Sequence, residues 1–416
     1  MGEDKDHLNR REFLQKSIHG ILTAGLFGVS RDRSTKRQEG SFREQSKKAI
    51  YRMLGRTKIQ LPVVSMGVMN AFEPALVRKS YEIGVRHFDT AAYYQRGHNE
   101  EMVGSVLKDL GVREKVYIGT KVFIPHEQRN MSDIRIRDFF LKSASDSLDR
   151  LKTDYIDILY VHNVTDTQFL NNPGIKEAML DLKDRKKIRF IGFSTHTNMS
   201  ECIRNATEDG FYDVIATAFN YALEDDIGLL KALQIASSKG IGIIAMKTQC
   251  SQYWYREYVP EEKLEYYKGC ILHTAVLKWV LQHDFITTAI PGYTTFQQME
   301  EDVSVAYNLE YSDKEKEFLN DRDVKQILRS YCQQCSSCVP SCPTQVDIPT
   351  LMRTHMYTYC YGKTHHAHDA LLDIPKGKGL DACISCGSCT ARCSKDINIE
   401  KRIFDLKRTF LSKGDS

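Results

Sequence analysis

Short apolar runs alternate with longer amphipathic segments from Ile50 to about Asn308. Each run has four to eight residues, is mostly rich in valine and isoleucine, and is bounded by Gly, Pro, Asp or Asn, which predicts buried strands. The runs occupy residues 63–68, 86–91, 116–122, 156–162, 188–194, 214–220, 241–247 and 286–291. The segments between them have the period of helices, most clearly at 99–110, 134–152, 226–238 and 270–282.

Eight strand–helix units within about 250 residues predict an α/β fold, and favour a (β/α)8 barrel over a doubly wound sheet. Residues 53–63 precede the first run and predict a hairpin that closes the barrel floor. In such barrels the chemistry takes place at the C-terminal ends of the strands. This rule selects Asp89, Lys121, His162 and Ser194 from the sequence.

Eight of the twelve cysteines fall into two matched runs near the C-terminus. Each run reads C-x2-C-x2-C-x3-C, the spacing of bacterial two-cluster ferredoxins, in which the fourth cysteine ligates the other run's cluster. We therefore expect one [4Fe–4S] cluster on Cys332, Cys335, Cys338 and Cys393, and a second on Cys383, Cys386, Cys389 and Cys342. The alternatives are a pair of zinc sites, which do not usually use a third cysteine at this spacing, and a disulfide framework.

Four short motifs lie at the ends of predicted strands, in order: His87–Tyr94 (HFDTAAYY), Gly119–Lys121 (GTK), Tyr160–His162 (YVH) and Ile191–Ser194 (IGFS). Over residues 50 to about 308 the chain resembles the aldo/keto reductases. The resemblance implies a barrel enzyme that interconverts a carbonyl and an alcohol by hydride transfer with a nicotinamide nucleotide. It also implies that the family's catalytic tetrad falls on Asp89, Tyr94, Lys121 and His162.

Carbonyl reduction places a hydride on carbon and a proton on oxygen, and the tetrad would supply the proton. Tyr94 would donate it, for which its pKa of about 10 must fall, while Lys121 would stabilise the phenolate. Asp89 would keep Lys121 charged, and His162 would orient the substrate carbonyl. Taken singly, Asp89 and Lys121 could form a structural ion pair, Tyr94 could be core, and His162 could be a satisfied histidine.

The resemblance further implies nucleotide contacts from Ser194 and Asn220, which would bond the nicotinamide amide, and from Glu301 and Asp302 at the end of the phosphate-binding stretch. For Glu301 and Asp302 the alternative is a solvated helix face. NADPH-specific members carry basic residues where Gly292 and Gln298 stand, so either NAD or NADP is expected, without a preference for NADP. Residues 240–245 fit G-x-G-x-x-A, but they end a helix and open a strand, so this is no dinucleotide fingerprint.

Residues 249–269 form an aromatic-rich insertion after the seventh strand. On the catalytic face it would either wall a pocket for a sugar-like or other ring substrate, or pack onto the cysteine-rich domain. Residues 348–361 predict a helix, and His365, His366 and His368 are expected in a solvent loop rather than at a metal.

The net charge of +4 over 416 residues predicts no nucleic-acid partner. No apolar run reaches the length of about 18 residues that a transmembrane span requires. Arg10-Arg11, followed by Phe13-Leu14 and a weakly apolar run to Val29, resembles a twin-arginine export signal, which implies a periplasmic protein. The alternative is a basic N-terminal helix of a cytoplasmic protein.

The expected organisation is a signal at 1–30, a linker at 31–49, the barrel at 50–308, a linker helix at 309–330, and a small α+β ferredoxin-like domain at 331–416. The leading hypothesis is a redox enzyme that acts on a small carbonyl or alcohol and has an electron-transfer partner not identified by the sequence. A second hypothesis is an electron-transfer or redox-sensing protein on a non-catalytic barrel. A third is an enzyme whose clusters are purely structural.

Overall fold

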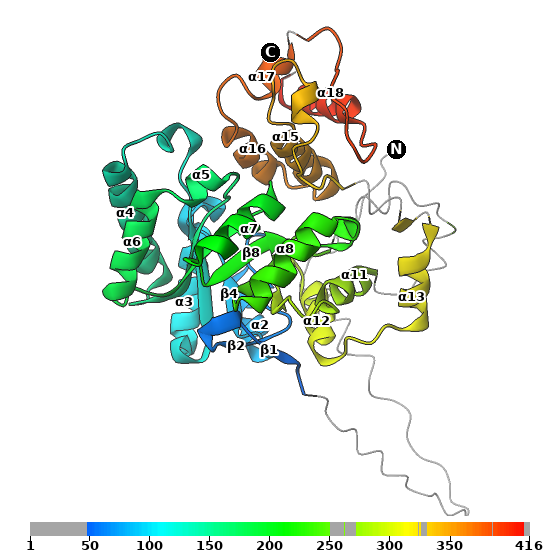
Figure 1. Cartoon of the computed structure of the whole chain (residues 1–416). Coiled ribbons are helices and arrows are strands. Elements are labelled where there is room, and N and C mark those ends of the chain that lie inside the picture. Colours follow the sequence, from blue (N-terminus) through cyan, green and yellow to red (C-terminus); the bar gives the residue numbers. More distant parts are fainter. Residues whose placement is uncertain are drawn as a thin grey trace, which may run out of the picture. The chain divides into compact units, whose positions relative to one another are not determined.

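The structure, a computed structural model, describes residues 48–249, 262, 272–322, 324–325, 331–384 and 386–411. The predicted export signal, almost all of the linker after it and nearly all of the aromatic insertion lie outside these residues. Figure 1 shows the elements from the first strands (blue) to the last helices (red).

The predicted barrel is confirmed as an eight-stranded sheet in which every strand pairs in parallel with the next. Its strands are β3 (Met66–Gly67), β4 (His87–Asp89), β5 (Tyr117–Val122), β6 (Ile156–Val161), β7 (Ile188–Thr195), β8 (Val214–Ala218), β9 (Gly242–Met246) and β10 (Thr288–Ala289). A parallel bridge between Val64 and Ala289 joins the two edges of the sheet. The strands read as apolar runs because both faces are covered, as in β6, where all six residues are buried.

Helices follow the strands and pack side by side around the sheet, as α3 does with α2 and α4. They are α2 (Pro74–Glu82), α3 (His98–Leu110), α4 (Asp133–Leu151), α5 (Thr167–Leu170), α6 (Pro173–Asp184), α7 (Met199–Asp209), α8 (Ile227–Ser238), α11 (Leu272–Leu281), α12 (Phe296–Ser304) and α13 (Asp313–Asn320). Short polar residues set their starts: Asn172 accepts a hydrogen bond from the amide of Ile175 ahead of α6, and Ser312 forms a capping box with Glu315 at α13.

The predicted hairpin is present as β1 (Tyr51–Met53) paired antiparallel with β2 (Gln60–Pro62). Leu54 and Leu61 are fully buried in a cluster with barrel residues such as Ile244. The glycine pattern at 240–245 leads from a helix into a strand, as expected, because α8 ends at Ser238 and β9 begins at Gly242. A Cβ at Gly242 would lie 2.6 Å from the Leu54 side chain, so the glycine lets the hairpin approach the barrel floor.

The C-terminal part consists of helices and loops, and residues 331–384 and 386–411 contain no strand. The helices are α15 (Ile348–His355), the π-helical turn η8 (Met356–Cys360), α16 (Thr364–Leu372), α17 (Leu380–Ile384) and α18 (Ile399–Phe410). They surround their own apolar core, to which Leu351 and Leu406 contribute fully buried side chains. This domain and the barrel are joined through the segment that contains α13, within the predicted linker helix.

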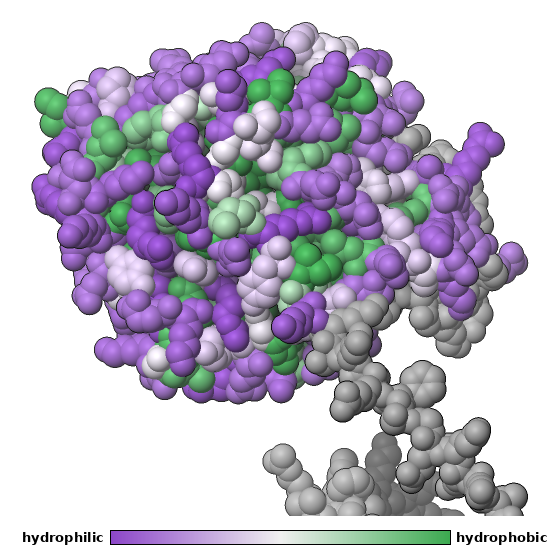
Figure 2. Space-filling model, turned by 60° about the horizontal axis from the view of Figure 1, so that its bottom comes forward, coloured by the Kyte–Doolittle hydropathy of each residue, from purple (hydrophilic) through white to green (hydrophobic). Residues whose placement is uncertain are grey.

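On the face in Figure 2, hydrophobic residues are interspersed among hydrophilic ones. Among the described residues, every helix is too short or too polar to span a bilayer.

Candidate active site

Four of the predicted site residues meet at the C-terminal ends of three adjacent strands. Asp89 ends β4, Lys121 lies on β5, and His162 follows β6 directly. The ammonium of Lys121 donates to the Asp89 carboxylate and, at 2.7 Å, to the carbonyl oxygen of Thr90. Tyr94 begins the short helix η2 (Tyr94–Gly97), and its ring centroid lies 5.7 Å from that of His162 and 5.2 Å from Lys121 Nζ.

The turn after Tyr94 is strained. Gln95 and Arg96 both have φ values above +50°, and Gly97 follows at φ +94°. Non-glycine residues in this region cost roughly 1–3 kcal/mol each and persist where the surroundings hold them. Gln95 is held by its side-chain amide, which donates to the carbonyl oxygen of Ala71 at 3.1 Å. These contacts hold the strained turn in place, and the turn thereby fixes the position of Tyr94 between β4 and α3.

Burial determines how these four groups titrate. Burial raises the pKa of Asp89 and lowers that of Lys121, and the charge of each partner opposes the shift of the other. Burial, then the negative charges of Asp89 and Tyr357, raise the pKa of Tyr94 well above its usual value. The lowered pKa expected for Tyr94 is therefore not found, and the phenol carries its proton.

His162 is neutral, because burial and then the charge of Lys121 hold its pKa well below the usual value. Among the described residues its Nδ1 is a buried atom without a hydrogen-bond partner, and so is Oδ1 of Asn163 next to it. Asn163 has φ +56°, which marks a second strained position at the strand ends. Both atoms are available to a bound molecule.

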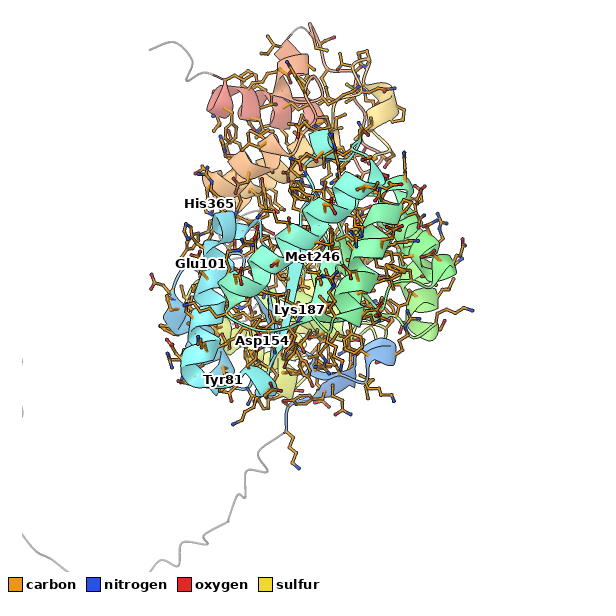
Figure 3. All side chains as sticks on the ribbon, turned by 90° about the vertical axis from the view of Figure 1, so that its left-hand side faces the viewer. Tyr81, Glu101, Asp154, Lys187, Met246 and His365 are labelled. Atoms are coloured by element: carbon orange, nitrogen blue, oxygen red, sulfur yellow. The ribbon has the colours of Figure 1, made fainter. Side chains whose placement is uncertain are left out.

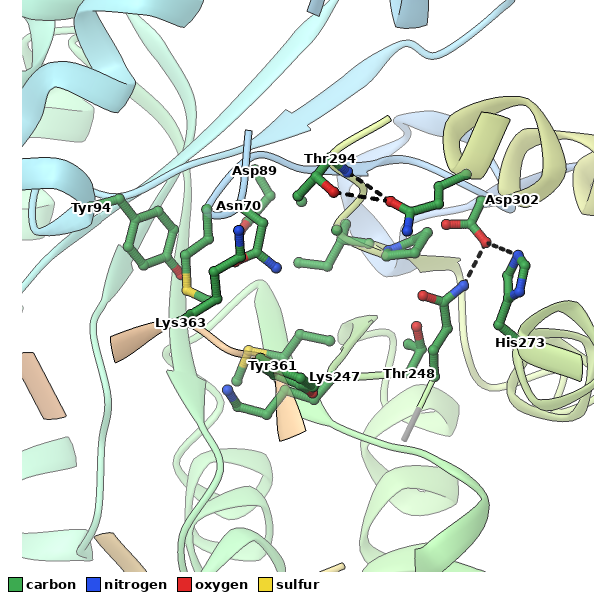
Figure 4. Close-up of a pocket in the computed structure, with 18 residues that line it drawn as sticks. Asn70, Asp89, Tyr94, Lys247, Thr248, His273, Thr294, Asp302, Tyr361 and Lys363 are labelled. Atoms are coloured by element: carbon green, nitrogen blue, oxygen red, sulfur yellow. Dashed lines mark hydrogen bonds and ion pairs between the residues drawn. The ribbon is translucent and has the colours of Figure 1, made fainter. Parts of the chain in front are cut away.

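A cavity of about 300 Å³ opens beside Asp89 and Tyr94 (Figure 4). The residues around it come from β3, β9, the segment from β10 to α12, and the chain after η8; they include Gly67, Met69, Asn70, Met246, Thr248, Gly292, Gln298, Asp302, Tyr361 and Lys363. Within the described chain, Thr248 Oγ1 is buried without a hydrogen-bond partner. A Cβ at Gly292 would lie 3.2 Å from Asn70 Nδ2, so the glycine keeps this wall open.

The predicted nucleotide residues are placed differently from one another. Ser194 is buried, its hydroxyl accepts from the amide of Asn163 at 3.1 Å, and it faces a smaller cavity described below. Asn220 is buried and its amide is bonded within the chain, donating to the carbonyl oxygen of Lys247 at 3.0 Å and accepting from the amide of Ala222 at 3.1 Å. Asn220 therefore caps a turn.

Glu301 and Asp302 lie on α12, and only Asp302 is fully buried and lines the large cavity. It accepts from the side-chain amide of Gln249, and burial raises its pKa to about 8. Glu301 is half-buried and lies 3.1 Å from Nε2 of His273. The solvated helix face considered for this pair is therefore wrong for Asp302.

A second, smaller cavity of about 70 Å³ lies between the barrel and the C-terminal domain. Tyr94 lines both cavities, as does Met246, which ends β9 and is labelled in Figure 3. The barrel adds Tyr93, Phe123, His162, Ser194 and His196, and the C-terminal domain adds Arg353, Tyr357, His366, Asp369 and Asp373. The C-terminal domain thus closes the site that the strand ends open.

Sequence reasoning did not identify the residues that close this cavity. Arg353 on α15 contacts Nδ1 of His196 at 3.1 Å, and Tyr357 on η8 accepts from Lys247 Nζ at 2.8 Å. Lys247 directly follows β9, and its sequence context does not mark it as part of this cavity. No motif marks the other two, which lie in the cysteine-rich half of the chain.

The three histidines expected in a loop are instead on helix α16. Nε2 of His366 contacts Asn70 Oδ1 at 3.0 Å, and burial lowers its pKa to about 3. The ring of His365, labelled in Figure 3, lies 5.5 Å from the ring of Phe72 on the barrel. This helix therefore packs against the barrel, which excludes the solvent loop.

Cysteines of the two runs lie together in the core of the C-terminal domain, where their thiols affect one another's pKa in two groups of four. Burial, followed by the neighbouring thiols of Cys332, Cys335 and Cys393, raises the pKa of Cys338 to about 12. Burial likewise raises the pKa of Cys383 to about 11, with contributions from Cys342, Cys386 and Cys389. Each group thus contains three cysteines of one run and the fourth of the other. Among the described residues, no three His, Cys, Asp or Glu side chains converge on a single metal ion.

The site's geometry and the paired cysteine groups define a redox protein with two functional modules. Residues 68–321 match the aldo/keto reductase family, and residues 331–397 match the 4Fe-4S dicluster domain. The chain belongs to the aldo/keto reductase family, and it carries an iron–sulfur domain of the ferredoxin-like kind at its C-terminus. It is an oxidoreductase.

Two curated relatives have named activities. The chain is 29% identical over 308 residues to L-galactose dehydrogenase of Arabidopsis thaliana, which covers 67% of this chain and 93% of that protein. It is 24% identical over 319 residues to L-glyceraldehyde 3-phosphate reductase of Escherichia coli (strain K12), which covers 64% of this chain and 90% of the relative. Both alignments are long enough to span the barrel.

Among solved structures, an aldo/keto reductase from Klebsiella pneumoniae in complex with NADP and acetate superimposes with a TM-score of 0.50 at 22% identity. The likeness covers 66% of this chain and 94% of that one. At 22% identity, this structural likeness supports the barrel fold alone.

Proposed function

We propose that the protein interconverts a small hydroxylated carbonyl compound and its alcohol by hydride transfer with a nicotinamide nucleotide. The observation that carries this is the meeting of Asp89, Tyr94, Lys121 and His162 at the strand ends, with Tyr94 on the border of two cavities. The large cavity would hold the nucleotide and the small cavity the substrate. Relatives named for L-galactose and for glyceraldehyde 3-phosphate support a sugar-like substrate.

The residues present fit a nucleotide. Within the described part of the chain, Thr248 offers a buried hydroxyl without a hydrogen-bond partner in the large cavity, and Gly292 leaves open the space that a side chain would fill. When bound, the nucleotide supplies or accepts the hydride, two electrons at a time. Burial raises the pKa of Asp302 to about 8, so its carboxyl is mostly protonated at pH 7 and would repel a phosphate group in this cavity only weakly.

The proton is handled by the chain itself. In the direction of reduction, protonated Tyr94 would donate to the substrate oxygen as the hydride reaches the carbon, which leaves an alcohol. Neutral His162 would donate a hydrogen bond to the same oxygen and orient it. Lys121, whose pKa is lowered by burial, can return a proton to Tyr94. Asp89 holds the Lys121 ammonium in place.

We further propose two [4Fe–4S] clusters, cross-ligated as the cysteine spacing predicts. The two groups of four thiols support this arrangement. Coupling of the clusters to the reductase site is favoured by one observation. Cys332 lines a narrow cleft together with His196, Lys247 and Arg353, three residues that also line the small cavity.

The test uses the full chain, purified without oxygen and assayed for iron, sulfide and bound nucleotide. Glyceraldehyde should oxidise added NADH or NADPH, and L-galactose with the oxidised nucleotide should reduce it. If sugar and nucleotide together also bleach the cluster absorbance, the clusters are coupled to the reaction; if turnover leaves them oxidised, they are structural. Absence of nucleotide-dependent turnover with all carbonyls tried would contradict the proposed enzyme.

A further inference from the structure

Tyr357 lies in an unusual segment that the cluster domain directs at the reductase site. Helix α15 continues into the π-helical turn η8, where the amide of Tyr361 donates to the carbonyl oxygen of Met356 at 3.0 Å. Such turns are rare and often occur at functional sites. The turn presents Tyr357 to the small cavity, one helical turn after Arg353, so both side chains face the barrel.

The barrel holds Tyr357 by its oxygen. Lys247 Nζ donates to the Tyr357 hydroxyl oxygen at 2.8 Å, and the ammonium lies 5.1 Å from the centre of the ring. Lys247 directly follows β9, and its φ of +55° is a strained value for a residue with a side chain. The phenol is also fixed by the ring of His366, whose centroid lies 5.8 Å away.

The two tyrosines of the cavity differ in character. Burial would raise the pKa of Tyr357, but the charges of Lys247 and Arg353 outweigh it, and the net shift is downward. Tyr94 has its pKa raised, partly by Tyr357. Because Lys247 Nζ donates to the Tyr357 oxygen, that oxygen lines the cavity as an acceptor, while the protonated Tyr94 is a donor.

The charges around the cavity favour an uncharged polar ligand. Lys247 is engaged with Tyr357, and Arg353 faces both Asp373 and His196. Among the described residues, both cations that line the cavity have partners in its wall, and Asp369 and Asp373 add negative charge, so the lining disfavours a carboxylate or phosphate. A volume of about 70 Å³ holds several water-sized groups, enough for a carbonyl and the hydroxyl beside it.

We propose that Tyr357 is a substrate-binding residue of the reductase site, contributed by the cluster domain. Its oxygen, held by Lys247, accepts a hydrogen bond from a hydroxyl on the carbon next to the reacting carbonyl, while Tyr94 and His162 bind the carbonyl oxygen. The site thus selects α-hydroxycarbonyl compounds. This inference rests on the proposed function and specifies its substrate class.

The test compares 2-hydroxypropanal, 3-hydroxypropanal and propanal as substrates of the anaerobic full chain, with whichever reduced nucleotide it uses. Wild type should prefer 2-hydroxypropanal over the other two by about ten- to a hundredfold in kcat/KM, the size of one charge-assisted hydrogen bond. In Tyr357→Phe this preference should shrink to within about threefold of unity, mainly through a higher KM for 2-hydroxypropanal. Propanal is the reference substrate, so a change in Tyr94 that alters the rate with every aldehyde cancels in this ratio.

Tyr359→Phe is the matched control. Tyr359 is on the same π-helical turn, but its hydroxyl bonds to Thr409 and to the carbonyl oxygen of Asp405 inside the cluster domain. This variant should keep the wild-type preference. Lys247→Gln is a second variant that should weaken the preference without removing the phenol. Iron and sulfide contents equal to those of wild type show that each variant has folded.

Some results would overturn this inference but leave the proposed function standing. They include an unchanged preference in Tyr357→Phe and an equal loss of kcat for all three aldehydes. A wild type that prefers propanal would do the same. A wild type that reduces none of the three, with its clusters intact, would instead contradict the proposed function on which the inference rests.

Discussion

At the scale of single residues, the proposed chemistry centres on Tyr94, which lines both cavities, as do Met69, Met246 and Lys247. Its proton is held by burial and by the negative charges of Asp89 and Tyr357. A phenol in this state is suited to donate a proton to a substrate oxygen. For the reverse reaction the phenolate would need Lys121, whose ammonium lies 5.2 Å from the ring centre.

The variant Tyr94→Phe removes only this proton donor. We expect turnover to fall by on the order of 10²-fold or more, because general acid catalysis contributes that much. Nucleotide affinity should remain, since the ring is kept. Steady-state kinetics and nucleotide titration measure the two effects, and a variant as fast as wild type toward every accepted carbonyl would refute the tetrad.

Asp302 should make stability depend on pH. Burial raises its pKa to about 8, so the folded chain keeps a proton that the unfolded chain releases once the pH exceeds its usual value. The unfolded state then binds fewer protons, and stability falls as the pH rises from about 4 to 8. Asp302→Asn should reduce the loss of Tm between about pH 5 and pH 8. A loss as large as that of wild type would contradict this assignment.

At the scale of elements, the start of α12 is where the proposed nucleotide would place its 2′-phosphate. Thr295 caps the helix, and Gln298 accepts from the amide and hydroxyl of Thr294 at 3.0 and 3.2 Å. No cation stands at Gly292 or Gln298, although Lys363 of the C-terminal domain lines the same cavity. The helix start therefore lacks the guanidinium that would bind a 2′-phosphate.

We therefore predict that NAD binds at least comparably to NADP. Gln298→Arg should shift the preference towards NADP, because a charge-assisted bond to phosphate contributes roughly 1.5–3 kcal/mol. Fluorescence titration of both nucleotides decides this. If wild type bound NADP about a hundredfold tighter than NAD, roughly 2.7 kcal/mol, another cation such as Lys363 would supply the clamp.

The two cysteine runs form a second unit at this scale, since each would complete the other's cluster. Cys393→Ser should damage the cluster held by Cys332, Cys335 and Cys338 and spare the other. Cys386→Ser is the control and should have the opposite selectivity. Iron and sulfide analysis with electron paramagnetic resonance of the reduced protein separates the two, and about two zinc ions without sulfide would overturn the cluster assignment.

At the scale of the whole molecule, the cluster domain and the barrel share one site. Arg353, Tyr357 and His366 reach the barrel from α15, η8 and α16, so damage to the domain's packing should change substrate binding as well as electron transfer. If the protein is exported, it would have to fold with its proposed clusters first, which suits a route for folded proteins. The twin-arginine signal proposed at the N-terminus would provide that route.

Replacing Arg10 and Arg11 by lysines tests this proposal. We expect the variant to stay in the cytoplasm with its clusters assembled, whereas the wild type reaches the periplasm. Cell fractionation followed by iron analysis of each fraction measures both properties. Equal distribution of the two proteins would mean that the arginine pair does not direct export.

The sequence alone determined the barrel, because parallel strands covered on both faces must be short apolar runs. It also determined the strand-end positions of Asp89, Lys121 and His162, since the first two lie in the second half of such a run and His162 ends one. The cysteine spacing predicts that the two runs cross-ligate their clusters, because one loop supplies three of the four thiols, and these ligand sets stay a prediction.

Only the tertiary structure decided how the site is closed. Tyr357 and Arg353 belong to a segment far from the barrel motifs, and their position depends on how α15 and η8 pack against the ends of β7 and β9. The direction of the Tyr94 pKa shift likewise depends on burial by neighbours distant in sequence. Periodicity reports which face of an element is buried, but not which domain buries it, and so the proposed substrate-binding wall appears only in the folded chain.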